Sequence, residues 1–195
     1  MKLDVASQDA FSAKKELRGA VPLMMASSTI PELEALGLLG PSYSDFRVGR
    51  FHGLDEINLR WVSQDWFEYI PNRSNLFGFE RYNGELIQPL RMFTDGGSIP
   101  RVAWIERTLS PWGYAPAYLI HDWEFDCHHN NLSPKSFEEV RDTMMEGVKT
   151  LMETGLGPKA PITFSIMYSA INSLIARAVW DGELSISSIP PSSDD

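Results

Sequence analysis

The stretch "FGFERYNGELIQPLRMFTD", residues 77–95, decides the fold class. Aromatic and aliphatic residues flank Asn83-Gly84, and this dipeptide accepts positive φ at the central positions of a tight turn, so the pattern predicts a β-hairpin. Upstream, three short segments with the same composition predict further strands: "FRVGRF" (46–51), "EINLRWV" (56–62) and "WFEYI" (66–70). We therefore expect a small antiparallel sheet that ends near Asp95.

After residue 100 the sequence becomes helical. The predicted helices are "RVAWIERTL" (101–109), "APAYLIHDWEFDCHH" (115–129), a segment from a cap at Ser133 to a stop at Gly155, and "ITFSIMYSAINSLIARAVW" (162–180). The last segment is apolar nearly all round, which is typical of a central helix. Strands first and helices later predict an α+β fold with a bundle of about four helices.

The chain divides into three predicted parts. Residues 1–45 form an N-terminal helical arm, whose second helix would start near Pro31, and residues 46–182 form a single α+β domain. Residues 183–195 form an acidic tail rich in Ser and Pro, which its composition predicts to be disordered.

The composition excludes several classes of function. The net charge is -9 and the basic residues do not cluster, so nucleic-acid binding is not expected. No segment has the length and apolarity of a signal peptide or of a membrane span. Cys127 is the single cysteine and has no partner for a disulfide; we expect a buried filler residue, with a catalytic thiol beside His128 and His129 as the alternative.

Two stretches carry the residue types of a catalytic site. In "FTDGGSIPR" (93–101), Asp95 ends a strand, two glycines allow a sharp turn, and Ser98 can cap the following helix. The helix 115–129 contributes His121 and Asp122 directly after an apolar run. We expect the two stretches to meet in one polar pocket; the alternative is a strand-to-helix corner without chemistry.

The same helix carries two polar stripes. Spacings of three and four residues place their members on two neighbouring faces: His121, Glu124 and His128 on one, and Asp122, Asp126 and His129 on the other. Imidazole and carboxylate groups are ligands for transition metals and also serve as general acids and bases. The alternative is a solvated helix end whose histidines interact with the helix dipole.

The combination of these motifs resembles a bacterial and phage family catalogued as domain of unknown function 1353. The matching positions, within about residues 80–180, are Thr94, Asp95, Ser98, Ile99 and Pro100, then Gly113 and Tyr114, then His121 and Asp122, and finally Asp142. The chain departs from the family pattern at Trp123-Glu124-Phe125, where an aromatic-Leu-Tyr run is usual, and at Arg141, where alanine is usual.

The resemblance implies a phage or prophage context, with virion proteins as partners, and implies that Asp95, His121, Asp122 and Asp142 belong together. The first hypothesis is a metal-assisted hydrolase, with a cell-wall polymer as the substrate suggested by this context. Its catalytic residues would be His121, Asp122, Asp95 and Ser98, and its metal ligands would be His121, Asp122, Asp95 and Asp142. Ligands rich in oxygen favour a divalent cofactor such as magnesium, manganese or calcium.

The alternative hypothesis is a non-catalytic virion structural or assembly protein, in which the Asp/His cluster is a hydrogen-bond network that fixes the fold. Either role places the protein in the host cytoplasm during assembly or in the virion. A third interpretation, sugar binding by the six tryptophans, requires them to share one exposed face.

Overall fold

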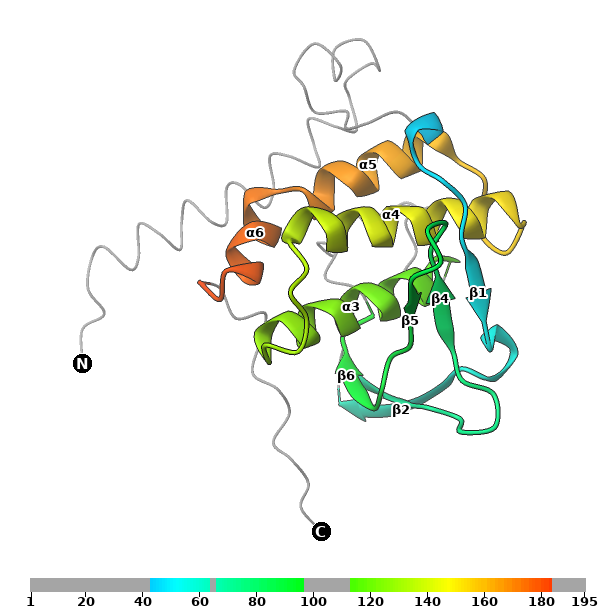
Figure 1. Ribbon diagram of the computed structural model, residues 1–195, viewed down its shortest axis with the longest axis vertical. Coiled ribbons are helices and arrows are strands. Elements are labelled where there is room, and N and C mark those ends of the chain that lie inside the picture. Colours follow the sequence, from blue (N-terminus) through cyan, green and yellow to red (C-terminus); the bar gives the residue numbers. More distant parts are fainter. Residues whose placement is uncertain (1–42, 64–65, 97–112, 184–195) are drawn as a thin grey trace, which may run out of the picture.

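The computed structural model describes residues 43–63, 66–96 and 113–183, and it confirms an α+β fold (Figure 1). The predicted arm up to residue 42, the predicted helix 101–109 and the tail from residue 184 lie outside the described residues. The strands are β1 (Arg50–His52), β2 (Asn58–Ser63), β3 (Trp66–Ile70), β4 (Gly78–Glu80), β5 (Leu86–Ile87) and β6 (Met92–Thr94). The helices are α3 (Ala115–His129), α4 (Phe137–Glu153), α5 (Pro161–Ile171) and α6 (Leu174–Trp180), with short 3-10 turns at Tyr43–Asp45 and Leu54–Glu56.

The described strands form two three-stranded antiparallel sheets instead of the single sheet that the sequence predicted. One sheet has the order β1-β4-β5 and the other has the order β2-β3-β6. Pro89 follows β5 and has no N–H group with which to extend its ladder. The chain leaves the first sheet there, and β6 pairs with β3 of the second.

The hairpin between β4 and β5 is confirmed, with a turn that differs from the prediction. The Gly84 N–H donates to the Arg81 carbonyl at 2.9 Å, and the Arg81 N–H donates to the Glu85 carbonyl at 2.8 Å. Gly84 has φ 87°, whereas Asn83 has a negative φ, so only one left-handed residue is needed. This is the pattern of a three-residue loop closed by a left-handed glycine.

Helix α4 is the centre of the helical layer, with α5 on one side and α3 on the other, and α3 in turn lies against β6 (Figure 1). The residues of α4 from Thr143 to Met152 are all buried. Gly147 allows α3 to approach closely, because a Cβ atom there would lie 3.3 Å from the Ala117 side chain. The apolar face of α4 packs on Tyr114, Tyr118 and Phe164 in the main core cluster.

The segment 162–180 is two helices, not the single central helix predicted from its apolar composition. Asn172 ends α5, and the Ser173 side chain caps α6 by accepting a hydrogen bond from the Ala176 N–H at 3.3 Å. The two axes bend by 51° at this break. Leu174 is 88% exposed, so the apolar surface of the segment is only partly buried.

No single helix in the described part of the chain has the length and apolarity to cross a membrane. The bent pair of α5 and α6 reaches these values only when its two helices are taken together.

The cap of α4 is Ser136 rather than the predicted Ser133. The Ser136 hydroxyl accepts from the Glu139 N–H at 3.3 Å, and the Glu139 carboxylate accepts from the Ser136 N–H at 2.8 Å, which forms a capping box. Ser133 instead accepts from the Lys135 N–H within the loop. The predicted stop is confirmed, because Gly155 follows the helix with φ 75°.

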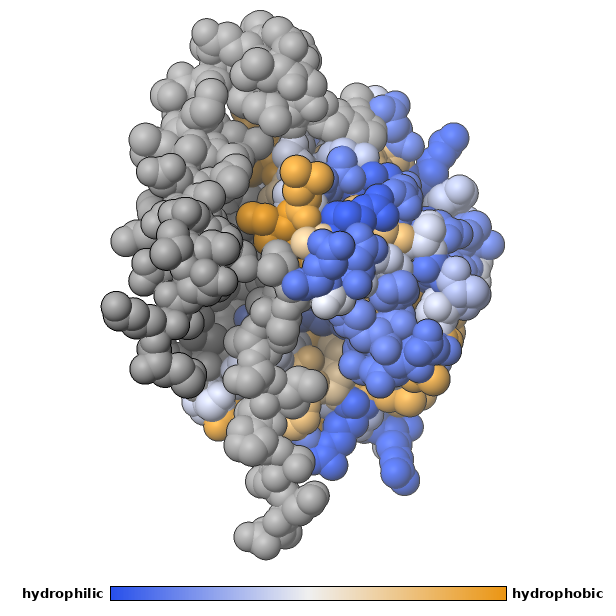
Figure 2. Space-filling model, turned by 90° about the vertical axis from the view of Figure 1, so that its left-hand side faces the viewer, coloured by the Kyte–Doolittle hydropathy of each residue, from blue (hydrophilic) through white to orange (hydrophobic). Residues whose placement is uncertain are grey.

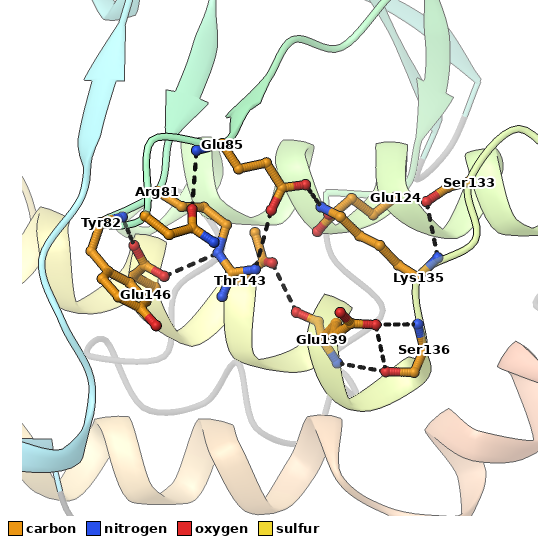
Figure 3. Close-up of polar contacts among 11 residues, drawn as sticks. Arg81, Tyr82, Glu85, Glu124, Ser133, Lys135, Ser136, Glu139, Thr143 and Glu146 are labelled. Atoms are coloured by element: carbon orange, nitrogen blue, oxygen red, sulfur yellow. Dashed lines mark hydrogen bonds and ion pairs between the residues drawn. The ribbon is translucent and has the colours of Figure 1, made fainter.

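A buried ionic network joins the hairpin to the helices (Figure 3). At its centre lies Glu146 of α4, which is 2% exposed. Its carboxylate accepts from the Tyr82 N–H at 2.5 Å and from Arg81 Nε at 3.1 Å. Glu146 therefore takes the place of water as the hydrogen-bond partner of the hairpin loop.

The network continues to α3 through Lys135. The Lys135 ammonium lies between the carboxylates of Glu124, on α3, and Glu85, on the hairpin. Arg81 Nη1 also contacts Glu85, at 3.3 Å. We refer to Arg81, Glu85, Glu124, Lys135 and Glu146 as the Glu146 network.

We predict that Glu146→Gln lowers the free energy of unfolding by about 3 kcal/mol, because the Arg81 guanidinium loses its buried charged partner and keeps only the half-buried Glu85. Chemical denaturation of wild type and variant measures the difference. Glu138→Gln is the matched control, since Glu138 lies on the same helix but is exposed, and it should change stability little. Equal stabilities of Glu146→Gln and wild type would contradict the role assigned to the network.

Candidate functional site

The candidate site lies where the end of β6 meets α3, so the two stretches do come together. Thr94, the last residue of β6, is 2% exposed, and its hydroxyl donates to Asp122 Oδ2 at 2.5 Å. The same hydroxyl oxygen accepts from the Gly96 N–H at 3.0 Å. Gly96 has φ 79°, a backbone conformation in which glycine is unstrained, and it turns the chain directly after Asp95.

Asp95 and Asp122 form a pair of interacting carboxyl groups. The pKa of Asp122 is raised well above its ordinary value, first by burial and then by the nearby charge of Asp95, and the Thr94 hydrogen bond only partly offsets this. Two close carboxyl groups in a poorly solvated site cannot both ionise readily, so the pair retains a proton more tightly than an exposed aspartate does. One protonated and one ionised carboxyl group are the requirements of a general acid and a general base.

Tyr118 adds a phenol group on the same face of α3 as Asp122. It precedes Asp122 by one helical turn and is 1% exposed. Its hydroxyl has no hydrogen-bond partner among the described residues. Burial, together with the charges of Tyr114 and Asp122, raises its pKa, so the phenol stays protonated.

His121 does not join the pair, although it precedes Asp122 directly. Consecutive residues of a helix point in different directions, and the His121 ring lies 4.5 Å from the Phe125 ring. The side chain is 7% exposed, and burial lowers its pKa to about 4. The imidazole is therefore neutral at physiological pH, and its Nδ1 atom has no partner in the described part of the chain.

Asp142 also lies away from the pair. Its carboxylate contacts the guanidinium of the adjacent Arg141 at 2.8 Å and lies close enough to Tyr168 of α5 to raise the pKa of that phenol. The reason is its position on α4, where it faces α5 rather than α3. Ser98, the remaining predicted residue, lies outside the described residues.

These placements do not assemble the four-ligand metal site predicted from the sequence. Within residues 43–63, 66–96 and 113–183, no group of three or more His, Cys, Asp or Glu side chains is placed to hold a metal ion. The pair offers two carboxylates and the Thr94 hydroxyl, which are oxygen donors only. The arrangement fits proton transfer better than the predicted ligand set.

The other polar residues of α3 have structural partners. Glu124 belongs to the Glu146 network, and the His128 ring stacks on Trp180 of α6 at 3.6 Å. His129 Nε2 lies 3.1 Å from the Val179 carbonyl oxygen. Burial and the charge of Asp126 raise the pKa of the Cys127 thiol, so this cysteine lacks the activation that a nucleophile needs.

The described tryptophans do not share an exposed face. Trp61 is 65% exposed, whereas Trp180 is buried among the helices and Trp123 packs against the second core cluster. The interpretation of the tryptophans as one sugar-binding surface therefore loses its basis for these residues. Trp104 and Trp112 lie outside the described residues.

Comparisons with known proteins find no match among family models, curated proteins or solved structures. The family resemblance noted in the sequence therefore stays a prediction. The site rests on its own geometry.

Sequence reasoning named Asp95 and Asp122 but did not use Thr94 or Tyr118 as functional groups. Thr94 was visible only as part of the family pattern. Tyr118 could have been found from its spacing, since a residue four positions before Asp122 lies on the same face of the helix.

We predict that His121→Leu removes a source of acid sensitivity. A depressed pKa means that stability contributed by neutral His121 is present above its ordinary pKa of 6.5 and is lost as the pH falls toward about 4. The loss amounts to about 3 kcal/mol. The free energy of unfolding, measured by denaturation at several values from pH 7 to pH 4, should change less with pH for His121→Leu than for wild type. His129→Leu is the control. Parallel pH profiles of wild type and His121→Leu would count against a buried neutral imidazole.

Proposed function

We propose that this chain is a phage-type, virion-associated protein with a hydrolytic site in which Asp95 and Asp122 act as an acid–base pair. The carboxyl pair at the junction of β6 and α3 is the single observation that carries the proposal. The proposed substrate is a bacterial cell-wall polymer, in keeping with the phage context that the family resemblance implies.

The environments of the two carboxyl groups suggest their roles. Asp122 is the more tightly held, through the Thr94 hydroxyl, and its pKa is raised, so it is the general acid that protonates the leaving group. Asp95, at the end of the strand, is then the ionised partner that accepts a proton from the attacking water. Rate enhancements of roughly 10²–10⁴ are typical of such proton transfer.

The Tyr118 phenol supports this assignment. Burial raises its pKa, so the hydroxyl stays protonated and adds no further negative charge beside Asp122. Since Tyr118 belongs to the main core cluster, the pair is built on a rigid helix rather than on a loop.

The second candidate function is a non-catalytic structural or assembly protein of the virion. Exposed apolar side chains on α5 and α6 favour it, because Ile162 is 57% and Leu174 is 88% exposed. Figure 2, which views the side on which α6 lies, shows small hydrophobic groups within a mostly hydrophilic surface. In this role the carboxyl pair would only hold β6 on α3.

We predict that wild-type protein clears a suspension of purified cell-wall sacculi and that Asp122→Asn lowers the rate at least ~100-fold. The amide cannot transfer the proton but keeps the size of the side chain and can still accept from Thr94. The rate should also fall both below and above an optimum pH, because one carboxyl group must be ionised and the other protonated.

Asp126→Asn provides the matched control. Asp126 lies four residues further along α3 and is exposed, so its variant should clear sacculi at the wild-type rate. Failure of the wild-type protein to clear sacculi, or full activity of Asp122→Asn, would contradict the hydrolase proposal and favour the assembly role.

A further inference from the structure

A second polar arrangement lies on the sheet formed by β2, β3 and β6. Arg60, Glu68 and Phe93 face one another across the three strands, since Glu68 pairs with Arg60 on one side and with Phe93 on the other. Residues in register share one face of a sheet. This is the face opposite to Tyr69 and Met92, which are buried in the core.

Two arginines cover the Glu68 carboxylate. Arg60 contacts Glu68 Oε2 through Nε at 2.7 Å and through Nη2 at 2.5 Å, and Arg91 Nε donates to Oε1. The Glu68 side chain is 1% exposed, whereas the side chains of Arg60 and Arg91 are 56% and 68% exposed. The glutamate is thus hidden beneath guanidinium groups whose outer edges face solvent.

The arrangement leaves donors and charge for a second anion. A guanidinium carries five N–H groups. Among the described residues, the contacts with Glu68 leave both terminal nitrogens of Arg91 and Nη1 of Arg60 for a ligand. The hydrogen bond from Arg91 and then those from Arg60 lower the pKa of Glu68, although burial opposes this. One ionised glutamate against two arginines leaves a surplus positive charge on a chain whose net charge is -9.

Phe93 gives this positive site an apolar neighbour. Its side chain is 40% exposed and lies beside Glu68 on the same face. The face of an aromatic ring packs against the C–H groups of a sugar ring, and a planar guanidinium binds a carboxylate with two parallel hydrogen bonds. A carboxylate attached to a pyranose ring matches both features.

We propose that Arg60, Arg91 and Phe93, with Glu68 as the positioning residue, form a subsite for a carboxylate-bearing saccharide. The inference rests on the proposed function and names the substrate class, an acidic wall polymer. Arg91 lies directly before β6 and Asp95 directly after it. The four residues from Arg91 to Asp95 span at most about 14 Å when extended. Phe93 and Thr94, which holds Asp122, lie on opposite faces of β6. A polymer held at the subsite would therefore reach the carboxyl pair around the end of β6, at Asp95.

The test uses polygalacturonate as the probe, since it carries one carboxylate on each pyranose ring, and its methyl ester as the neutral counterpart. Titration calorimetry of the full chain should show binding of polygalacturonate, weaker at higher salt, and no binding of the methyl ester. Arg60→Gln and Arg91→Gln should each weaken binding about tenfold or more. Arg50→Gln, which changes an exposed arginine on the other sheet, should leave the affinity unchanged within about twofold.

A further variant separates binding from folding. Arg91→Lys keeps the charge above Glu68 but loses the planar fork, so it should melt like wild type and still bind more weakly. No binding by the wild-type protein, equal binding of the methyl ester, or an equal loss in Arg50→Gln would overturn the subsite. Asp122→Asn should bind polygalacturonate as wild type does, since Asp122 lies outside the subsite. If the wild-type protein binds polygalacturonate but does not clear sacculi, the proposed reaction is contradicted and the subsite stands.

Discussion

The ion pair between Glu146 and Arg81 is the interaction on which the arrangement of sheets and helices depends. In the loop at the end of the hairpin of β4 and β5, the Tyr82 N–H and the Arg81 guanidinium need hydrogen-bond partners away from water. Glu146 satisfies one N–H of that loop and one guanidinium from within the buried face of α4. Because the cost of leaving either group unpaired is high, the hairpin has one favourable position on the helix.

The network also contains more acid than base, with Glu85, Glu124 and Glu146 against Arg81 and Lys135. Burial raises the pKa of Glu124 to about 7, although Lys135 opposes this, and Glu124 Oε2 has no partner among the described residues. Raised carboxyl pKa values therefore occur at two places in this fold. At Glu124 the main cause is burial within a structural network, with a smaller contribution from the charge of Glu85, and at Asp122 it is burial beside a second aspartate at the end of a strand. A raised pKa alone therefore does not identify a functional site, and the proposed site rests also on the position of the pair at the junction of β6 and α3.

Local patterns in the sequence predicted most of the elements, and contacts between distant residues explain the failures. Asn83-Gly84 predicted the hairpin, and an apolar run predicted α3. Gly155 predicted the end of α4. The break between α5 and α6 was missed because the apolar periodicity runs through it, while the Ser173 cap depends on a single hydroxyl group. The division into two sheets depends on which strands pair, and short strands of similar composition carry little information about partners.

The candidate site was predictable in part for the same reason. Asp95 and Asp122 both lie at the ends of apolar runs, where a polar side chain faces the edge of the core. The predicted partnership with His121 and Asp142 needed the direction of each side chain on its helix. His121 turns into the apolar contact with Phe125, and Asp142 turns toward α5, which spacing alone did not reveal.

The central claim is that Asp122 is a carboxyl group whose proton is held by burial and by Asp95. Titration of its side-chain carboxyl carbon by ¹³C NMR, in wild type and in Asp95→Asn, tests this most directly. The account predicts that wild-type Asp122 titrates well above the usual range for aspartate and that Asp95→Asn lowers its pKa while leaving it elevated. Titration near the ordinary value of about 4 in both proteins would contradict the account.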